Sequence, residues 1–112
     1  MADFNIKAHD RLPSIRAELT VSATKGPVNL TDALNVRFIM TTAVGAATKV
    51  AMPASIEDAA GGIVRYDWQE VDTDTPGKYL AEWEVTWAGG KRQTFPTGSY
   101  HTIEVLADLD GA

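Results

Sequence analysis

The chain has 112 residues, the length of one domain, and a hydrophobic content of 45 % that is ordinary for a globular protein. Acidic residues outnumber basic ones by 15 to 10, for a formal net charge of −5, which argues against nucleic acid as a partner. The absence of cysteine excludes disulfides and suits a protein made in a reducing cytoplasm. Residues 1–10 lack the apolar segment of a signal peptide, and no apolar run has the length of a membrane span, so we expect no membrane partner.

Apolar and polar residues alternate with a period of two in segment after segment, which is the pattern of half-buried β-strands. The clearest example is 78–87, where every second residue from Tyr79 to Trp87 is apolar. Pro53 is expected to stop a short strand, and 54–62 is interpreted as a loop or the outer part of a hairpin. The expected strands are 14–22, 34–42, 49–52, 63–68, 78–87, 91–95 and 99–106, with a short segment at 28–30.

These segments follow one another without an amphipathic helix between them. About seven short antiparallel strands of this kind predict an all-β fold, an immunoglobulin-like β-sandwich. We expect a single domain over residues 1–112, with a loosely ordered tail from about residue 107.

Residues 74–81 have the form of a tyrosine corner, in which a tyrosine entering a strand bonds back to the preceding turn. They read Asp-Thr-Pro-Gly-Lys-Tyr-Leu-Ala, with Tyr79 in the key position. The alternative is a core tyrosine that merely follows a Pro-Gly turn.

The sequence offers no recognisable catalytic, cofactor-binding or metal-binding motif. His9 and His101 are the only histidines and have no ligand spacing. A loop starting at Asp72 resembles an EF-hand, but its fifth position is Pro76 and its twelfth is Trp83, which cannot bind calcium as that loop requires. We therefore expect no metal and no cofactor, no enzymatic activity, and aspartates that cap the turn before the next strand.

The tryptophans have different expected places. Trp83 lies mid-strand and is expected in the core, whereas Trp68 and Trp87 at strand ends are either lids of the core or exposed anchors. A hairpin at Gly89-Gly90 brings an aromatic residue on each side close to two cations, a composition favoured at binding hot spots. The expected interface residues are Trp87, Lys91, Arg92 and Phe95. The alternative is that both aromatic side chains fold inward.

The chain also resembles the immunoglobulin-like N-terminal domain of phage baseplate upper proteins and related tailed-phage structural proteins. The motifs that carry the resemblance are Phe4-x-Ile6, 10–15 (DRLPSI), Leu19, 28–33 (VNLTDA), 36–40 (VRFIM), 62–68 (GIVRYDW), 72–85 (DTDTPGKYLAEWEV) and 90–96 (GKRQTFP).

The resemblance implies a bacteriophage virion structural protein of the tail, baseplate, neck or capsid surface. Such a protein would be made in the bacterial host cytoplasm, would need no cofactor, and would bind other virion proteins in multiple copies of a symmetric assembly. One alternative is a host-surface or carbohydrate-binding module of a phage particle, in which Trp68, Trp87 or Tyr100 would stack on sugar rings. Another is an enzyme accessory domain.

Overall fold

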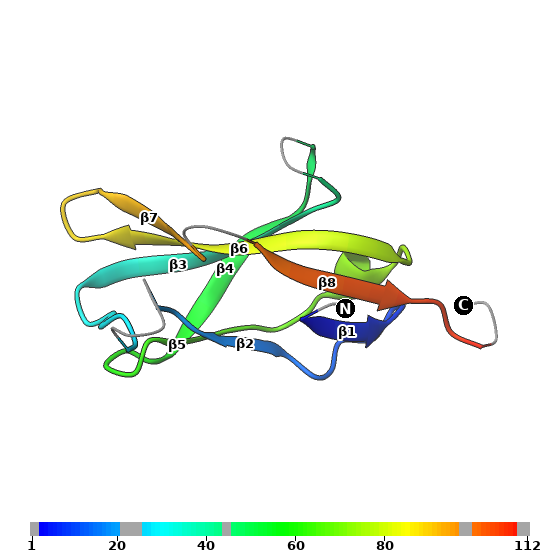
Figure 1. The fold of residues 1–112 in the computed structure, drawn as a ribbon, viewed down its shortest axis with the longest axis horizontal. Coiled ribbons are helices and arrows are strands. Elements are labelled where there is room, and N and C mark those ends of the chain that lie inside the picture. Colours follow the sequence, from blue (N-terminus) through cyan, green and yellow to red (C-terminus); the bar gives the residue numbers. More distant parts are fainter. Residues whose placement is uncertain (1–2, 21–25, 44–45, 97–99, 110–112) are drawn as a thin grey trace.

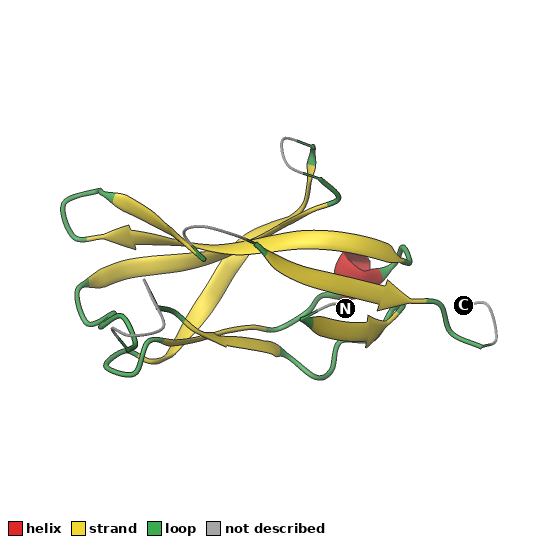
Figure 2. Ribbon diagram, in the orientation of Figure 1, coloured by secondary structure: helices red, strands yellow, loops and turns green. Residues whose placement is uncertain are grey.

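The computed structural model describes residues 3–20, 26–43, 46–96 and 100–109, and it confirms an all-β, immunoglobulin-like sandwich (Figures 1 and 2). Within these residues the sheet has eight strands, against about seven expected from the pattern. The elements are β1 (Phe4–Lys7), β2 (Ile15–Glu18), β3 (Ala33–Thr41), β4 (Thr48–Asp58), β5 (Ile63–Tyr66), the 3-10 helix η1 (Glu70–Thr73), β6 (Gly77–Trp87), β7 (Arg92–Phe95) and β8 (His101–Leu106). No helix in the described ranges is long and apolar enough to cross a membrane.

The strands follow the order β1-β8-β6-β3-β4-β5-β2, and β7 pairs with β6 beside β8. All pairs are antiparallel except β1 with β8, which makes the sheet mixed rather than purely antiparallel. The expected strands did not include β1, although its apolar Phe4 and Ile6 alternate with Asn5 and Lys7. Parts of three expected elements, residues 21–22, 99 and 110–112, lie outside the described residues.

Strand β4 joins the two layers of the sandwich. Its first half pairs with β3, and its second half pairs with β5 through Ser55 opposite Arg65 and Ile56 opposite Val64. Figure 1 shows β4 running diagonally from one layer to the other. The open edge between β1 and β2 keeps the sheet from closing into a barrel.

One expectation for this part of the chain was wrong. Pro53 does not stop the strand, because there β4 pairs only with β3 and a proline without an N–H is tolerated on an unpaired edge. Residues 54–58 belong to β4 and form the outer part of hairpin β4–β5, which confirms one of the two interpretations of 54–62. The segment 28–30 is not a strand: Val28 donates to the Leu19 carbonyl at 2.8 Å, and Leu30 donates to the Ala59 carbonyl at 2.7 Å.

An aromatic cluster centred on Phe38 fills the core. Phe38 on β3 stacks on Tyr66 and packs against Trp83, each at 4.9 Å between ring centroids, and it meets the edge of Trp68 at 5.5 Å. Phe38, Trp68 and Trp83 are 0 % exposed. The prediction that Trp83 is a core residue is confirmed, and Trp68 is a core residue rather than an exposed anchor.

The tyrosine corner is present. Tyr79 Oη donates a hydrogen bond to the Thr75 carbonyl at 2.6 Å, while its ring is buried. The bond fixes the turn that leads into β6 before the strand pairs with β8 and β3.

We predict that Trp83→Ala lowers the free energy of unfolding by about 3–5 kcal/mol, because it removes the largest side chain at the centre of the layer containing β3 and β6. Urea unfolding measures the change. Leu34→Ala is the control: Leu34 is 65 % exposed on β3, and its loss should change the free energy by less than about 0.5 kcal/mol. An unchanged midpoint for Trp83→Ala would contradict the core described above.

We predict that Tyr79→Phe costs about 1 kcal/mol, because the Thr75 carbonyl loses its donor while the buried ring stays. Tyr100→Phe is the matched control, since Tyr100 is 44 % exposed. Equal unfolding midpoints for the two variants would show that the corner bond contributes nothing to stability.

Candidate functional site

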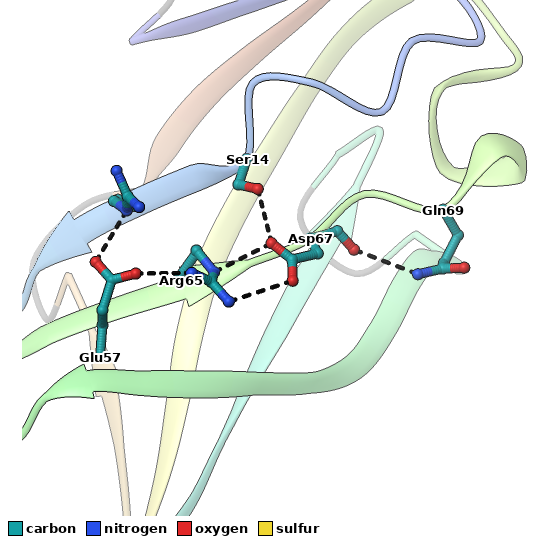
Figure 3. Close-up of polar contacts among 6 residues, drawn as sticks. Ser14, Glu57, Arg65, Asp67 and Gln69 are labelled. Atoms are coloured by element: carbon teal, nitrogen blue, oxygen red, sulfur yellow. Dashed lines mark hydrogen bonds and ion pairs between the residues drawn. The ribbon is translucent and has the colours of Figure 1, made fainter.

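The outer face of the layer formed by β2, β5 and β4 carries a charge ladder, which consists of Arg16, Glu57, Arg65 and Asp67 together with Ser14. The register places Arg16 directly opposite Arg65. Glu57 bridges the two arginines: its Oε1 lies 2.9 Å from Arg16 Nε, and its Oε2 lies 2.9 Å from Arg65 Nη1. Figure 3 shows Arg65 between Glu57 and Asp67.

The ladder solves a local electrostatic problem. Two like charges directly opposite each other on neighbouring strands are destabilising. The carboxylate of Glu57, supplied by the third strand, offsets this repulsion, and Asp67 balances Arg65 from the other side with its Oδ1 3.1 Å from Arg65 Nε. That contact is an ion pair rather than a hydrogen bond, because Arg65 Nε has no acceptor at hydrogen-bond geometry.

Because the side chains of the ladder are exposed, each ion pair contributes little to the free energy of unfolding. The side chains of Arg16 and Glu57 are 61 % and 31 % exposed, so each pair contributes less than about 1 kcal/mol. The ladder has two cations and two carboxylates, and it presents no net charge to a partner.

A shallow depression of about 540 Å³ lies beside the ladder. Arg11, Leu12, Ser14, Arg65, Asp67 and Trp68 line it. Arg11 Nε donates to the Trp68 carbonyl at 3.2 Å, and within the described ranges Arg11 has no carboxylate partner. Leu12 is 76 % exposed at the rim. The depression therefore offers a cation and an apolar side chain next to each other.

The residues predicted as an interface divide into two groups. Lys91 and Arg92 are exposed at the tip of hairpin β6–β7, with Arg92 Nη1 3.6 Å from Glu84 Oε2. Trp87 is half-buried, and its Nε1 donates to Gln93 Oε1 at 3.1 Å.

Phe95 is 1 % exposed and belongs to the core, which corrects its place in the expected interface. The register puts Phe95 opposite Trp83, so its side chain points into the sandwich. Which residues of β7 face the core depends on how β7 is aligned with β6, and the sequence of the hairpin alone does not determine that alignment.

The acidic residues around η1 have structural partners. Asp72 is buried, and its Oδ2 accepts hydrogen bonds from Tyr66 Oη at 2.5 Å and from the Gln69 N–H at 2.8 Å. Burial, and then the hydrogen bond to Asp72, raise the pKa of the Tyr66 phenol well above its usual value. Asp72 thus caps the turn, as expected from the sequence.

Asp74 makes an ion pair with Lys49. The hydrogen bond from Lys49, and then that from Thr75, lower the pKa of the Asp74 carboxyl. The carboxylate is therefore engaged in holding the turn before β6.

A second, smaller depression of about 370 Å³ lies between the ends of β1 and β8 and the edge strand β2. His101 lines it, with Nδ1 3.9 Å from Asp3 Oδ2, while that same oxygen accepts the Thr102 N–H at 3.0 Å. His9, the other histidine, lies at the end of the β1 turn with a positive φ of 68°. Among the residues that the structure describes, no three His, Cys, Asp or Glu side chains come together as a metal site.

We predict that His101 makes stability depend on pH near neutrality. Burial lowers the pKa of His101 below its ordinary value of 6.5, and the nearby Asp3 only partly opposes this. The unfolded chain therefore binds the proton more readily, so the contribution of His101 is complete above pH 6.5 and is lost as the pH falls below it.

His101→Gln should remove this part of the pH dependence. Urea unfolding of both proteins at about pH 7.5 and about pH 5.5 measures it, since the carboxylates titrate mainly below that range. Equal losses of stability in the two proteins on acidification would contradict the assignment to His101.

Comparison with known proteins supports the fold and not the expected family. No family model matches the chain, and no curated protein matches it. Among solved structures, the chain is similar to the crystal structure of CopC from Methylosinus trichosporium OB3b, with a TM-score of 0.53 and 13 % sequence identity. The similarity covers 96 % of this chain and 86 % of that chain, and at this identity it shows the fold alone.

The resemblance to phage baseplate upper proteins is therefore wrong, since the match found is to CopC and no family model supports the phage assignment. The virion function and the phage-borne carbohydrate-binding function, which rested on this resemblance, are therefore wrong as well. The motifs that carried it, such as the tyrosine corner at Tyr79 and the buried Trp83, are requirements of the fold. They specify an immunoglobulin-like sandwich and not a lineage.

Proposed function

We propose that the protein is a binding domain without catalytic activity, and that it docks the tip of hairpin β6–β7 on an acidic surface of a partner protein. The observation that carries the proposal is the pair of exposed cations, Lys91 and Arg92, at this tip. The Arg92 side chain is 67 % exposed although it lies near Glu84, so its guanidinium remains accessible.

Two adjacent exposed cations stand out in a protein whose overall charge is negative. The chain carries a formal net charge of −5, so an acidic partner is repelled by most of its surface. A basic tip would orient such a partner and accelerate its association, because complementary charge acts mainly on specificity and on-rate. Nucleic acid would meet the same overall repulsion with few cations to compensate.

The surroundings of the tip suit a docking surface. The indole of Trp87 is held by Gln93 on the face of the hairpin opposite to Arg92, and tryptophan is enriched at binding hot spots. Strand β7 pairs with β6, and no other strand of the described part of the chain pairs with it.

The carboxylates that could act as acids or bases are engaged in structural contacts, which favours a binding role over catalysis. Asp72 holds Tyr66 and Gln69 inside the fold. Glu57 is shared between Arg16 and Arg65. These groups maintain the sandwich, whereas the hairpin cations do not hold the core.

We predict that Lys91→Glu with Arg92→Glu lowers partner binding about tenfold and leaves the domain folded, because the change reverses the charge of an exposed tip. A benzophenone amino acid at Ala88, exposed beside the turn, would capture the partner from an extract of the source organism, and mass spectrometry would identify the crosslinked peptide. The expected product is one protein joined at an acidic segment.

Lys7→Glu with Lys78→Glu is the matched control, since it makes the same change of charge on exposed lysines of β1 and β6 away from the tip. The control should keep the crosslink. Equal yields in both double variants, or equal losses, would show that the hairpin is not the contact.

A further inference from the structure

The depression beside the charge ladder offers a cation without a carboxylate partner in the described part of the chain, and an exposed leucine; one nitrogen of the cation, Arg11 Nε, donates to the Trp68 carbonyl. Arg11 and Leu12, which we call the Arg11–Leu12 site, place an exposed guanidinium next to a leucine that is 76 % exposed. Arg65, which also lines the depression, is already balanced by Glu57 and Asp67. The site therefore fits a carboxylate with an apolar side chain beside it.

The chain itself carries this complementary pair. Asp108 and Leu109 follow β8, and Leu109 is 104 % exposed. Asp108 has no ion-pair partner within the described ranges. The two segments match in order, a cation followed by leucine in one and an anion followed by leucine in the other.

The root of this tail lies at the same end of the molecule as the site. The Ala8 N–H donates to the Leu106 carbonyl at 2.7 Å, and Arg11 is in the same β1–β2 connection as Ala8. Figure 1 shows the end of β8 on the opposite side from hairpin β6–β7. The three residues from Leu106 to Leu109 span at most about 10 Å, which keeps the tail near this end.

We propose that a second copy of this chain docks its Asp108-Leu109 tail in the Arg11–Leu12 site, and that the exchange is reciprocal. Asp108 of one copy pairs with Arg11 of the other, and the two leucines pack together. A two-fold axis at this end satisfies both tails at once, because each copy presents the same site and the same tail.

The exchange buries a small area, so the association is weak and depends on concentration. It concerns the end of the sandwich away from hairpin β6–β7 and does not depend on the function proposed for the hairpin.

Sedimentation velocity of the full chain from about 10 μM to about 1 mM, the range of weak contacts, tests the proposal. The wild-type protein should shift from monomer to dimer across this range. Arg11→Glu and Asp108→Lys should each weaken the association about tenfold, since each places like charges face to face. Asp108 lies outside the strands and makes no ion pair in the described structure, so the Asp108→Lys variant should keep the fold. It therefore still tests the proposal if the Arg11→Glu variant, which loses the hydrogen bond to the Trp68 carbonyl, fails to fold.

A mixture of the two variants gives the sharpest result. In a mixed pair, Glu at position 11 faces Lys at position 108, and Arg11 faces Asp108, so both contacts are favourable. The mixed dimer should form as readily as the wild-type dimer, and native mass spectrometry would distinguish it from either homodimer.

Lys91→Glu and Leu34→Ser are the controls, the first changing a cation at the other end and the second an exposed leucine elsewhere. Both should dimerise as the wild type does. A wild-type protein that stays monomeric over the whole concentration range would overturn the proposal. Docking of the tail on its own chain would also give this result. Dimerisation that neither charge reversal weakens would overturn it as well.

Discussion

Packing of one phenylalanine against rings from both layers is the contact on which the rest of the structure depends. Phe38 on β3 touches Trp83 within its own layer and Tyr66 and Trp68 from the other. The chain has no cysteine, so no disulfide joins the layers, and this cluster takes that place. Strand β4 also links the layers, because it pairs with β3 in its first half and with β5 in its second.

The polar contacts follow from this arrangement. Tyr66 stacks on Phe38 with its ring, and its hydroxyl reaches the buried carboxylate of Asp72. Asp72 in turn caps η1, and the adjacent Thr73 donates to the Asp10 carbonyl, which anchors the β1–β2 connection. A single line of contacts thus runs from the core to the loop that carries Arg11. The geometry of that exposed site is set by the aromatic packing beneath it.

The sequence predicted most of the fold because its strands are half-buried. Strict alternation around Trp83 and Val64 places one face in the core, and period two identifies such strands without further information. Alternation does not show where a strand changes partners, so the crossover of β4 from β3 to β5 between Ala54 and Ser55 was missed. The site was less predictable: the exposure of Lys91 and Arg92 followed from local sequence, but the burial of Phe95 depended on register. The Arg11–Leu12 site combines a connection with the end of β5, and no sequence pattern joins them.

Ion pairing decides which cations remain for recognition. Arg16 and Arg65 share Glu57, Arg37 pairs with Glu84, and Lys49 pairs with Asp74. These cations lie on the faces of the sandwich, where a neighbouring strand supplies a carboxylate at a fixed spacing. Turns and connections have no such neighbour, so cations placed there stay unpaired. This explains why Lys91 and Arg11, which lie at turns, have no carboxylate partner among the described residues. The other cations without a carboxylate partner in the described ranges, Lys7 and Lys78, lie at the end of β1 and near the start of β6, so the cations left to recognise carboxylates lie toward the ends of the sandwich.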